Sequence, residues 1–399
     1  MIFDYLLGFL GLLVLVLRLK PKKKESYNQL LSDFPLVSIV VPCRNEQANI
    51  EPLLKSLVQI EYPQFEVLVV DDESTDRTWN IAEAIRDAER VHGRDNIVLL
   101  KAPSKPAEYV GKNWACAIGA EHARGSWILF TDADTRHERQ SLKEALQFAY
   151  AKDLSLVSAI PYHLCSKGFE RFLGLFHLLP LIASCAFRGE YSALKRVSRK
   201  SRIYAIGQYL LFRKKTYEAI GGHTRIHASL SEDIDLATLV LLEGKKENSS
   251  EGGAKEECKE IDKQEYNKEY KEKCKEEYKE KYKYGVFTQT PLYKVQMYGS
   301  FKEFFKGWQR LIRIGSNRVS AMAFVEIALI FSLFTQMTWL SLIGVVLLLR
   351  IQRSHGDFSF IGAVLAPLSL LLFLTISILG FIENFQRKGI VWHDRIYNT

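Results

Sequence analysis

Hydrophobic and polar positions follow two patterns along this chain, and the first of them occupies residues 36–160. Short apolar runs recur between longer segments in which apolar residues return every three or four positions. The short runs lack an alternation of apolar and polar residues, which is typical of strands buried on both faces of a parallel sheet. We expect strands at Leu36–Val41, Phe65–Val70, Ile97–Leu100, Trp127–Phe130 and Leu154–Ile160. We expect helices at Glu46–Gln59, Asp76–Arg90, Gly111–Arg124 and Arg139–Tyr150. This order predicts a doubly wound α/β domain that binds ligands at the carboxyl edge of its sheet.

The second pattern is continuous hydrophobicity near both ends of the chain. Residues Ile2–Leu17 form an apolar run just long enough to span a bilayer, at about 1.5 Å per residue. A cleaved signal peptide carries its positive charges before the apolar run, whereas here the basic cluster Lys22–Lys24 follows it. We therefore predict a retained anchor whose N-terminus lies outside the cell.

Two further apolar segments, Met322–Leu349 and Phe358–Phe381, predict a membrane hairpin with basic residues on its cytoplasmic side. The first segment is long and contains Glu326, so both one tilted span and two shorter segments fit it. The stretch Phe169–Phe187 is interrupted by Pro180, and we interpret it as an interfacial or buried helix. The predicted location is the cell membrane, with several spans and the α/β domain in the cytoplasm.

Composition and charge refine this picture only slightly. The chain of 399 residues is 47% hydrophobic and 12% aromatic, which excludes a disordered protein. Its net charge of +8 lies largely beside the apolar segments, which favours contact with anionic lipid over binding to nucleic acid. The six cysteines have no Cys-x-x-Cys spacing and are expected to be reduced and structural. The Lys-, Glu- and Tyr-rich segment 244–284 has no apolar stripe, so it is interpreted as a surface insertion, either helical or disordered.

Candidate binding residues follow directly after the first two predicted strands. They are Pro42, Arg44, Asn45 and Glu46 after the first strand, and Asp71, Asp72 and Ser74 after the second. Carboxylates at this edge can accept hydrogen bonds from a nucleotide's base or ribose, although capping of the next helix also explains them. No Gly-x-Gly-x-x-Gly follows the first strand, which disfavours a dinucleotide-dependent dehydrogenase.

Two acidic pairs are candidates for catalysis. Asp132 and Asp134 leave a buried strand two residues apart, and such a pair can hold Mg²⁺ or Mn²⁺ together with substrate phosphates. The cation would stabilise a departing diphosphate. Glu232 and Asp233 lead into an apolar helical run, where they supply either N-terminal helix charge or a general base.

Taken in order, these segments resemble the family 2 glycosyltransferases of the GT-A fold. The resemblance covers residues 37–318 apart from the insert. Its motifs are Val41–Glu46, Val70–Asp76, Gly111–Ala115, Thr131–Thr135, Gly221–His223 and Ser231–Asp233.

The resemblance implies a role for each group of residues. The nucleotide pocket would be lined by Pro42, Arg44, Asn45, Glu46, Asp71, Asp72 and Ser74. Lys112 would approach the diphosphate, and Asp132 and Asp134 would form the metal-binding Asp-x-Asp motif, with Asp134 the nearer to the metal. Asp233, beside Glu232, would be the general base of an inverting displacement.

The acceptor side rests on the same resemblance. Residues Trp308–Arg313 lie where many membrane members carry a Gln-x-x-Arg-Trp motif, but the spacing differs, and a basic juxtamembrane helix also explains them. The acceptor-side candidates are His223, Gln309, Arg310 and Arg313.

The expected acceptor is hydrophobic. Gly111–Ala115, Asp132–His137 and the ending Val391–Tyr397 are similar to members that act on carotenoid acids or belong to hopanoid pathways. The sequence therefore predicts a membrane-bound enzyme that moves a sugar from a nucleotide-diphospho-sugar, UDP-linked in our prediction, to a lipid. A processive polysaccharide synthase and a catalytically silent nucleotide-binding membrane protein are the alternatives.

The predicted organisation has six parts. They are an anchor (1–20), the α/β domain (36–243), the insert (244–284), the end of the domain with a juxtamembrane helix (285–320), the apolar segments (322–381) and a cytoplasmic tail (382–399).

Overall fold

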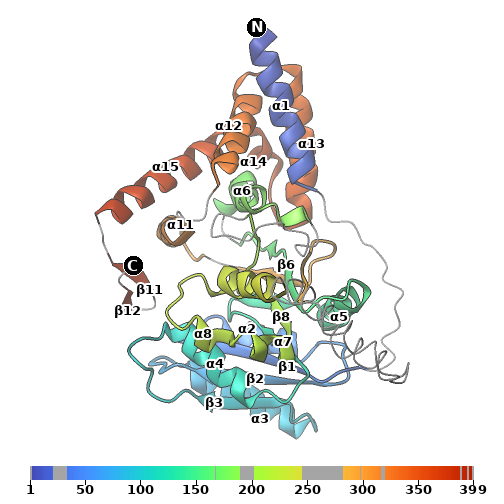
Figure 1. The fold of residues 1–399 in the computed structure, drawn as a ribbon, viewed down its shortest axis with the longest axis vertical. Helices are drawn as coiled ribbons and strands as arrows, with labels where there is room; N and C mark the ends of the chain where they lie inside the picture. Colours follow the sequence, from blue (N-terminus) through green and yellow to red (C-terminus); the bar gives the residue numbers. More distant parts are fainter. Residues whose placement is uncertain are drawn as a thin grey trace, which may run out of the picture.

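The computed structural model describes residues 2–20, 34–166, 168–188, 202–244, 282–296, 298–315, 320–386, 389–392 and 395–397. Its largest sheet has seven strands in the order β3-β2-β1-β4-β8-β6-β9 (Figure 1). The strands are β1 (Val37–Cys43), β2 (Phe65–Asp71), β3 (Ile97–Lys101), β4 (Trp127–Phe130), β6 (Leu156–Ala159), β8 (Leu210–Arg213) and β9 (Tyr284–Phe287). Strand β8 is antiparallel to β4 and β6, and the other neighbours are parallel. The predicted α/β class and mostly parallel sheet are confirmed.

Burial on both faces explains why the strands are continuously apolar. In β1, Val40 packs with Ala115 of α4 on one face, while Ile39 packs with Leu53 of α2 on the other. The helices around the sheet are α2 (Ile50–Leu57), α3 (Thr78–Val91), α4 (Gly111–His122), α5 (Ser141–Ala151), α7 (Lys214–Ala219) and α8 (Gly222–Arg225). Because the side chains of β1 enter two cores, a polar side chain on either face of the strand would be costly unless it were hydrogen-bonded.

Two smaller sheets were not predicted. One has the order β5-β10-β7, with β5 (Thr135–His137), β7 (Tyr162–His163) and β10 (Tyr293–Val295). The other is a hairpin of β11 (Ile390–Trp392) and β12 (Arg395–Tyr397). Strands of two or three residues carry too little periodicity to be read from a sequence.

A second group of helices stands to one side of the sheet (Figure 1). It comprises α1 (Ile2–Arg18), α6 (Gly174–Ser184), α11 (Phe301–Gly315), α12 (Ala321–Thr335), α13 (Trp339–His355), α14 (Phe360–Val364) and α15 (Ala366–Phe385), with the 3₁₀ turns η1 (Glu170–Phe172) and η2 (Ala186–Arg188). We call this group the helical region. The sheet region consists of the seven-stranded sheet, the sheet β5-β10-β7 and the helices α2–α5, α7 and α8. Within the helical region, helix α6 is buried, as one of the two interpretations of Phe169–Phe187 predicts.

The segment Met322–Leu349 is not one helix. Helices α12 and α13 meet at an angle of 114° across a break of a few residues. In the break, Met337 has a left-handed φ of 50°, and Thr338 and Ser341 form a capping box that starts α13. Of the two predicted alternatives, the two shorter segments are therefore correct.

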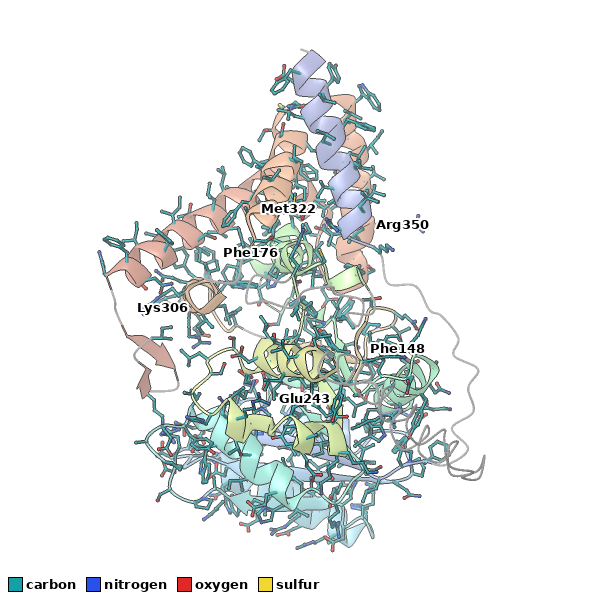
Figure 2. The ribbon with its side chains drawn as sticks, viewed as in Figure 1. Phe148, Phe176, Glu243, Lys306, Met322 and Arg350 are labelled. Atoms are coloured by element: carbon teal, nitrogen blue, oxygen red, sulfur yellow. The ribbon has the colours of Figure 1, made fainter. Side chains whose placement is uncertain are left out.

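The outer surface of the helical region is apolar. Phe324 of α12, Val346 of α13 and Phe381 of α15 are each more than 60% exposed. Figure 2 shows such side chains standing out from these helices, with Met322 labelled among them. Among the described helices, α15 alone is long and apolar enough to cross a membrane by itself; the bent pair α12–α13 passes the same test only when its two helices are taken together, as a broken span or a re-entrant loop. The predicted multi-pass topology is therefore not supported.

An ion cluster joins three segments inside the helical region. The guanidinium of Arg18 at the end of α1 donates to Glu326 Oε1 of α12 at 2.6 and 2.9 Å. Arg202 Nη1 donates to the same oxygen at 3.0 Å. Glu326, the one acidic residue noted in the predicted span, is thus 4% exposed and neutralised by two arginines.

Several predicted features lie outside the described residues. These are the basic cluster at 22–24, most of the 244–284 insert, and parts of the C-terminal tail.

Candidate active site

The loops after β1 and β2 lie side by side at the carboxyl edge of the sheet because Cys43 is the register partner of Asp71. Hydrogen bonds join the loops along their length. The Asn45 amide donates to Ser74 Oγ at 3.0 Å, and Asn45 Oδ1 accepts from the Thr75 amide at 2.8 Å. Asn45 holds a left-handed φ of 56°, a conformation that asparagine tolerates better than most residues. The seven residues predicted for the nucleotide pocket are therefore brought together.

Within this pair of loops, several polar groups have definite partners. Arg44 Nη1 donates to the carbonyl oxygen of Asp72 at 2.6 Å, and Glu46 Oε2 accepts from Asn49 at 2.8 Å. Burial raises the pKa of Glu46. Asp71 is buried and accepts from the Ser74 amide at 3.3 Å. Asp71, Asn45 and Ser74 thus shape the loops, whereas Pro42 is half-buried beside them in β1.

Lys112 lies at the centre of the acidic groups. It is the second residue of α4, whose N-terminus points at the sheet edge, and its Nζ lies 2.7 Å from Asp132 Oδ1 and 2.7 Å from Glu232 Oε1. Burial acts to lower the pKa of Lys112, but the carboxylates of Asp132 and Glu232 outweigh burial and hold it well above its usual value. The ammonium group of Lys112 thus bridges two acidic pairs that are 100 residues apart in the sequence.

Asp134 is the least compensated carboxylate of the site. Gln208 Nε2 donates to Asp134 Oδ2 at 3.4 Å, while the buried Oδ1 accepts no hydrogen bond from the residues described. Burial, reinforced by the charges of Asp132 and Glu46, raises the pKa of Asp134 to about 8. A buried carboxylate with an unused oxygen fits a hard cation, which favours oxygen ligands.

The protein's own side chains supply only part of a metal site. Within the described ranges, no group of three or more His, Cys, Asp or Glu side chains is arranged to hold a metal ion. Mg²⁺ and Mn²⁺ sites that use one or two carboxylates are completed by water and substrate phosphates. Asp132 and Asp134 fit that kind of site.

Asp233 is held at the start of a helix at residues 232–244. Its Oδ2 accepts from the Gly207 amide at 3.2 Å, and its Oδ1 accepts from the Ile234 amide at 2.7 Å. Burial, followed by the charge of Glu232, raises the pKa of Asp233 to about 7. A carboxylate with such a pKa can both take up and release a proton near neutral pH.

The residues predicted for the acceptor side lie on α8 and α11, outside the loops after β1 and β2. His223 is 1% exposed, its Nδ1 lies 2.8 Å from Tyr217 Oη, and burial lowers its pKa to about 3. Arg313 on α11 forms an ion pair with Glu383 of α15 at 3.1 Å. Arg310 is also on α11, and burial lowers its pKa. Gln309 shares this helix, and its carbonyl faces Gly380 of α15. These contacts pack His223 against Tyr217 and join α11 to α15, and the acceptor-side roles stay predictions.

Two residues of the site carried no signal that we recognised, and a third belonged to a motif whose contact the sequence did not reveal. Gly207 and Gln208 precede β8 and contact Asp233 and Asp134, but their segment matches no motif. Arg395, in the C-terminal ending singled out above, donates to Asp72. Its motif was visible in the sequence, but its contact lies 323 residues away.

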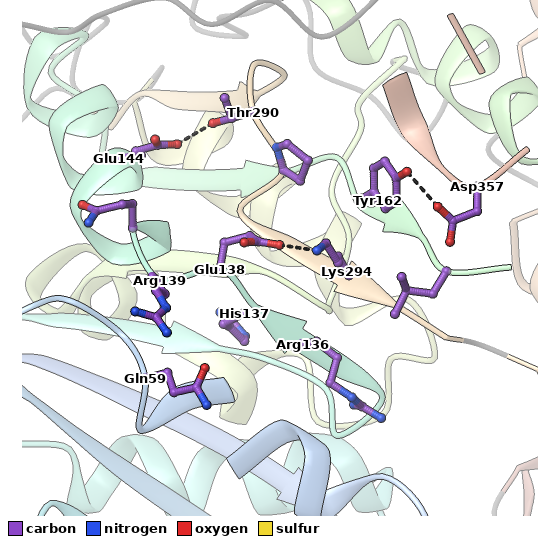
Figure 3. A pocket seen from close by; sticks show the side chains of 13 residues that line it. Gln59, Arg136, His137, Glu138, Arg139, Glu144, Tyr162, Thr290, Lys294 and Asp357 are labelled. Carbon is purple, nitrogen blue, oxygen red and sulfur yellow. Dashed lines mark hydrogen bonds and ion pairs between the residues drawn. The ribbon is translucent and has the colours of Figure 1, made fainter. Parts of the chain in front are cut away.

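A cavity of about 790 Å³ lies apart from these carboxylates. Figure 3 shows its polar lining, in which Lys294 faces Glu138 and Tyr162 faces Asp357. These pairs are 2.8 and 2.9 Å apart. Asp132, Asp134, Glu232 and Asp233 are not among its lining residues, and its polar groups largely neutralise one another.

Comparison with known proteins matches part of the chain, mainly in the sheet region, to a family. Residues 38–221 match the family described as Glycosyl transferase family 2. The 4,4'-diaponeurosporenoate glycosyltransferase of Staphylococcus haemolyticus (strain JCSC1435) is 28% identical over 202 residues, which is 50% of this chain and 50% of that protein. The protein of the same name from Staphylococcus aureus (strain MRSA252) is 30% identical over 204 residues, or 51% and 50%. The chain thus spans about half the length of the curated relatives it matches.

A solved structure is similar over nearly the whole chain. It is a mannosyltransferase from Pyrobaculum calidifontis in complex with GDP-Man and Mn2+, with a TM-score of 0.52 and 15% sequence identity. The match covers 95% of this chain and 96% of that one. At this identity the similarity establishes the fold, which is GT-A-like, and the resemblance drawn from the motifs is confirmed.

Proposed function

We propose that this chain, which carries a glycosyl transferase family 2 domain at residues 38–221, transfers a sugar from a nucleotide-diphospho-sugar to a hydrophobic acceptor at a membrane surface. The observation that carries the proposal is the bridge made by Lys112 between Asp132 and Glu232. This bridge supports a site in which Lys112 would bind phosphate beside an acidic pair and a candidate base.

The donor side follows from the strand ends. Pro42, Arg44 and Asp72 border the space for the nucleotide, and Lys112 at the N-terminus of α4 attracts the diphosphate. Asp134, with Asp132, would hold a divalent cation, which stabilises the negative charge of the leaving diphosphate when it is bound. The Mn2+ in the mannosyltransferase structure supports this assignment.

The acceptor side follows from Asp233. The hydrogen bonds from the Gly207 and Ile234 amides fix its carboxylate, and a pKa of about 7 lets it take the proton of an acceptor hydroxyl as that oxygen attacks the sugar. Attack from the side opposite to the leaving diphosphate inverts the anomeric carbon.

A hydrophobic acceptor is supported by two observations. The named relatives are diaponeurosporenoate glycosyltransferases, and the helical region of this chain exposes a broad apolar surface. Exposed apolar patches of this kind mark contact with a membrane or partner.

The test is release of nucleoside diphosphate by the full-length protein in detergent. UDP- and GDP-sugars are supplied with Mg²⁺ or Mn²⁺, with and without a total lipid extract. We expect one donor to be turned over and the lipid extract to stimulate the reaction. A folded protein that binds nucleotide but releases none with any donor would be a silent binding module, and a product with many sugar units would make it a polysaccharide synthase.

A further inference from the structure

The chain returns from the helical region to the nucleotide pocket through its last residues. After α15, the hairpin β11–β12 lies beside the sheet region (Figure 1). Arg395, the first residue of β12, donates from Nη1 to Asp72 Oδ2 at 2.6 Å and from Nη2 to Asp72 Oδ1 at 3.3 Å. The guanidinium therefore holds both oxygens of a carboxylate that is 5% exposed.

The surroundings are built to admit this guanidinium. Arg395 Nη2 also donates to Glu73 Oε2 at 3.0 Å, while Arg44 holds the backbone carbonyl of Asp72. A Cβ at Gly111 would lie 2.1 Å from Arg395 Nη1 and 2.5 Å from Asp72 Oδ2. A larger residue at 111 would thus require the arginine or the carboxylate to shift.

Physical chemistry gives this contact more weight than a surface ion pair. A carboxylate removed from water needs a counter-charge, and loss of one partner of such a pair is strongly destabilising. The planar fork of arginine also fixes the plane of the carboxylate that it grips, which a lysine does only weakly.

We propose that Arg395 is a positioning residue of the donor site, and that the C-terminal hairpin is part of that site. By gripping Asp72, it orients the carboxylate toward the nucleotide's base. This inference rests on the proposed function, since it takes Asp72 as a nucleotide-binding group.

The test measures nucleotide binding and turnover separately in full-length protein. Dissociation constants for UDP and for GDP are measured calorimetrically in the presence of Mn²⁺, and KM and kcat are measured from diphosphate release. We expect Arg395→Ala to raise the dissociation constant and the donor KM about tenfold and to leave kcat within about twofold. Arg395→Lys should recover part of the loss. Arg90→Ala, which removes an exposed ion pair on α3, is the matched control and should change neither constant.

A double-mutant cycle identifies the path of the effect. If Arg395 acts through Asp72, Arg395→Ala adds little once Asp72→Ala is present. The inference would be overturned by additive losses or by an unchanged affinity in Arg395→Ala. Tighter binding in that variant would also overturn it, because the arginine would then block the pocket. Failure of the proposed function looks different, since the wild-type protein would then release no diphosphate with any donor, whether or not it binds a nucleotide.

Discussion

The sheet region and the helical region expose opposite kinds of side chain. In the sheet region, strand residues such as Val37 and Leu129 are 0% exposed, and the polar groups collect at one edge. In the helical region, Val346 and Phe385 are 68% and 85% exposed, while Glu326 is buried with two arginines. A surface that exposes apolar groups and hides charges suits a lipid environment, whereas the reverse suits water. Under the proposed function, the chemistry belongs to the sheet region and the membrane contact to the helical region.

The largest effect is expected when the proposed base, Asp233, is replaced. Asp233→Asn should lower kcat by about a thousandfold, because an amide cannot take the acceptor's proton, and should leave donor binding and membrane association unchanged. Diphosphate release and nucleotide titration measure the two effects. Asp87→Asn, on the exposed surface of α3, is the control. Retained turnover would mean that the attacking oxygen arrives already ionised, as in a carboxylate acceptor.

The second test concerns the metal. Asp134→Ala should weaken metal-dependent UDP or GDP binding by about a hundredfold, since even the groups around a metal's ligands are worth ten- to a hundredfold in affinity. Titration of nucleotide with and without Mn²⁺ measures this effect. Asp153→Ala, an exposed carboxylate distant from the sheet edge, provides the comparison. Equal losses with and without metal would assign Asp134 to structure.

A pH profile sharpens the role of Asp233 without any mutation. Because the pKa of Asp233 is raised to about 7, the ionised form that accepts a proton is lost as the pH falls through 7. At saturating donor, kcat should fall about tenfold per unit below that value and be flat above it. An ordinary carboxyl group would place the break near pH 4. A break there would contradict the assignment of Asp233 as the base.

The smallest expected effect tests the helical region alone. An aspartate at the centre of a lipid-exposed helix costs about 2.5–3.5 kcal/mol, but other apolar helices remain in place. Val346→Asp should therefore raise the fraction of protein released from membranes by carbonate only a few-fold, with turnover in detergent unchanged. Val91→Asp, at an 85% exposed position in the sheet region, should release none. Equal behaviour of the two variants would break the comparison between the regions.

Local signals predicted most of the fold and the centre of the site. Apolar runs placed β1 to β4 within a residue or two, and their acidic endings located Asp72, Asp132 and Asp134 at one edge, because parallel strands end together. The sequence also allowed two segments in place of the span at Met322–Leu349, and the capping residues Thr338 and Ser341 explain the break.

The remaining features depend on contacts that no local pattern encodes. Gln208 reaches Asp134 only because β8 inserts antiparallel between β4 and β6. His223 belongs to a motif, but the motif does not show that Tyr217 and Phe130 fix its ring. The helix that carries Arg313 is basic in sequence, but the charge is used to hold α15.

The link between residues 72 and 395 also has a consequence for how the protein is made. Domains fold in order as the chain leaves the ribosome, so β1, β2 and their loops are complete long before the hairpin emerges. Arg395 lies 323 residues after Asp72, so the loop that carries Asp72 is synthesised well before its partner. The growing chain thus carries the loops of the proposed nucleotide pocket without their arginine until the hairpin β11–β12 emerges.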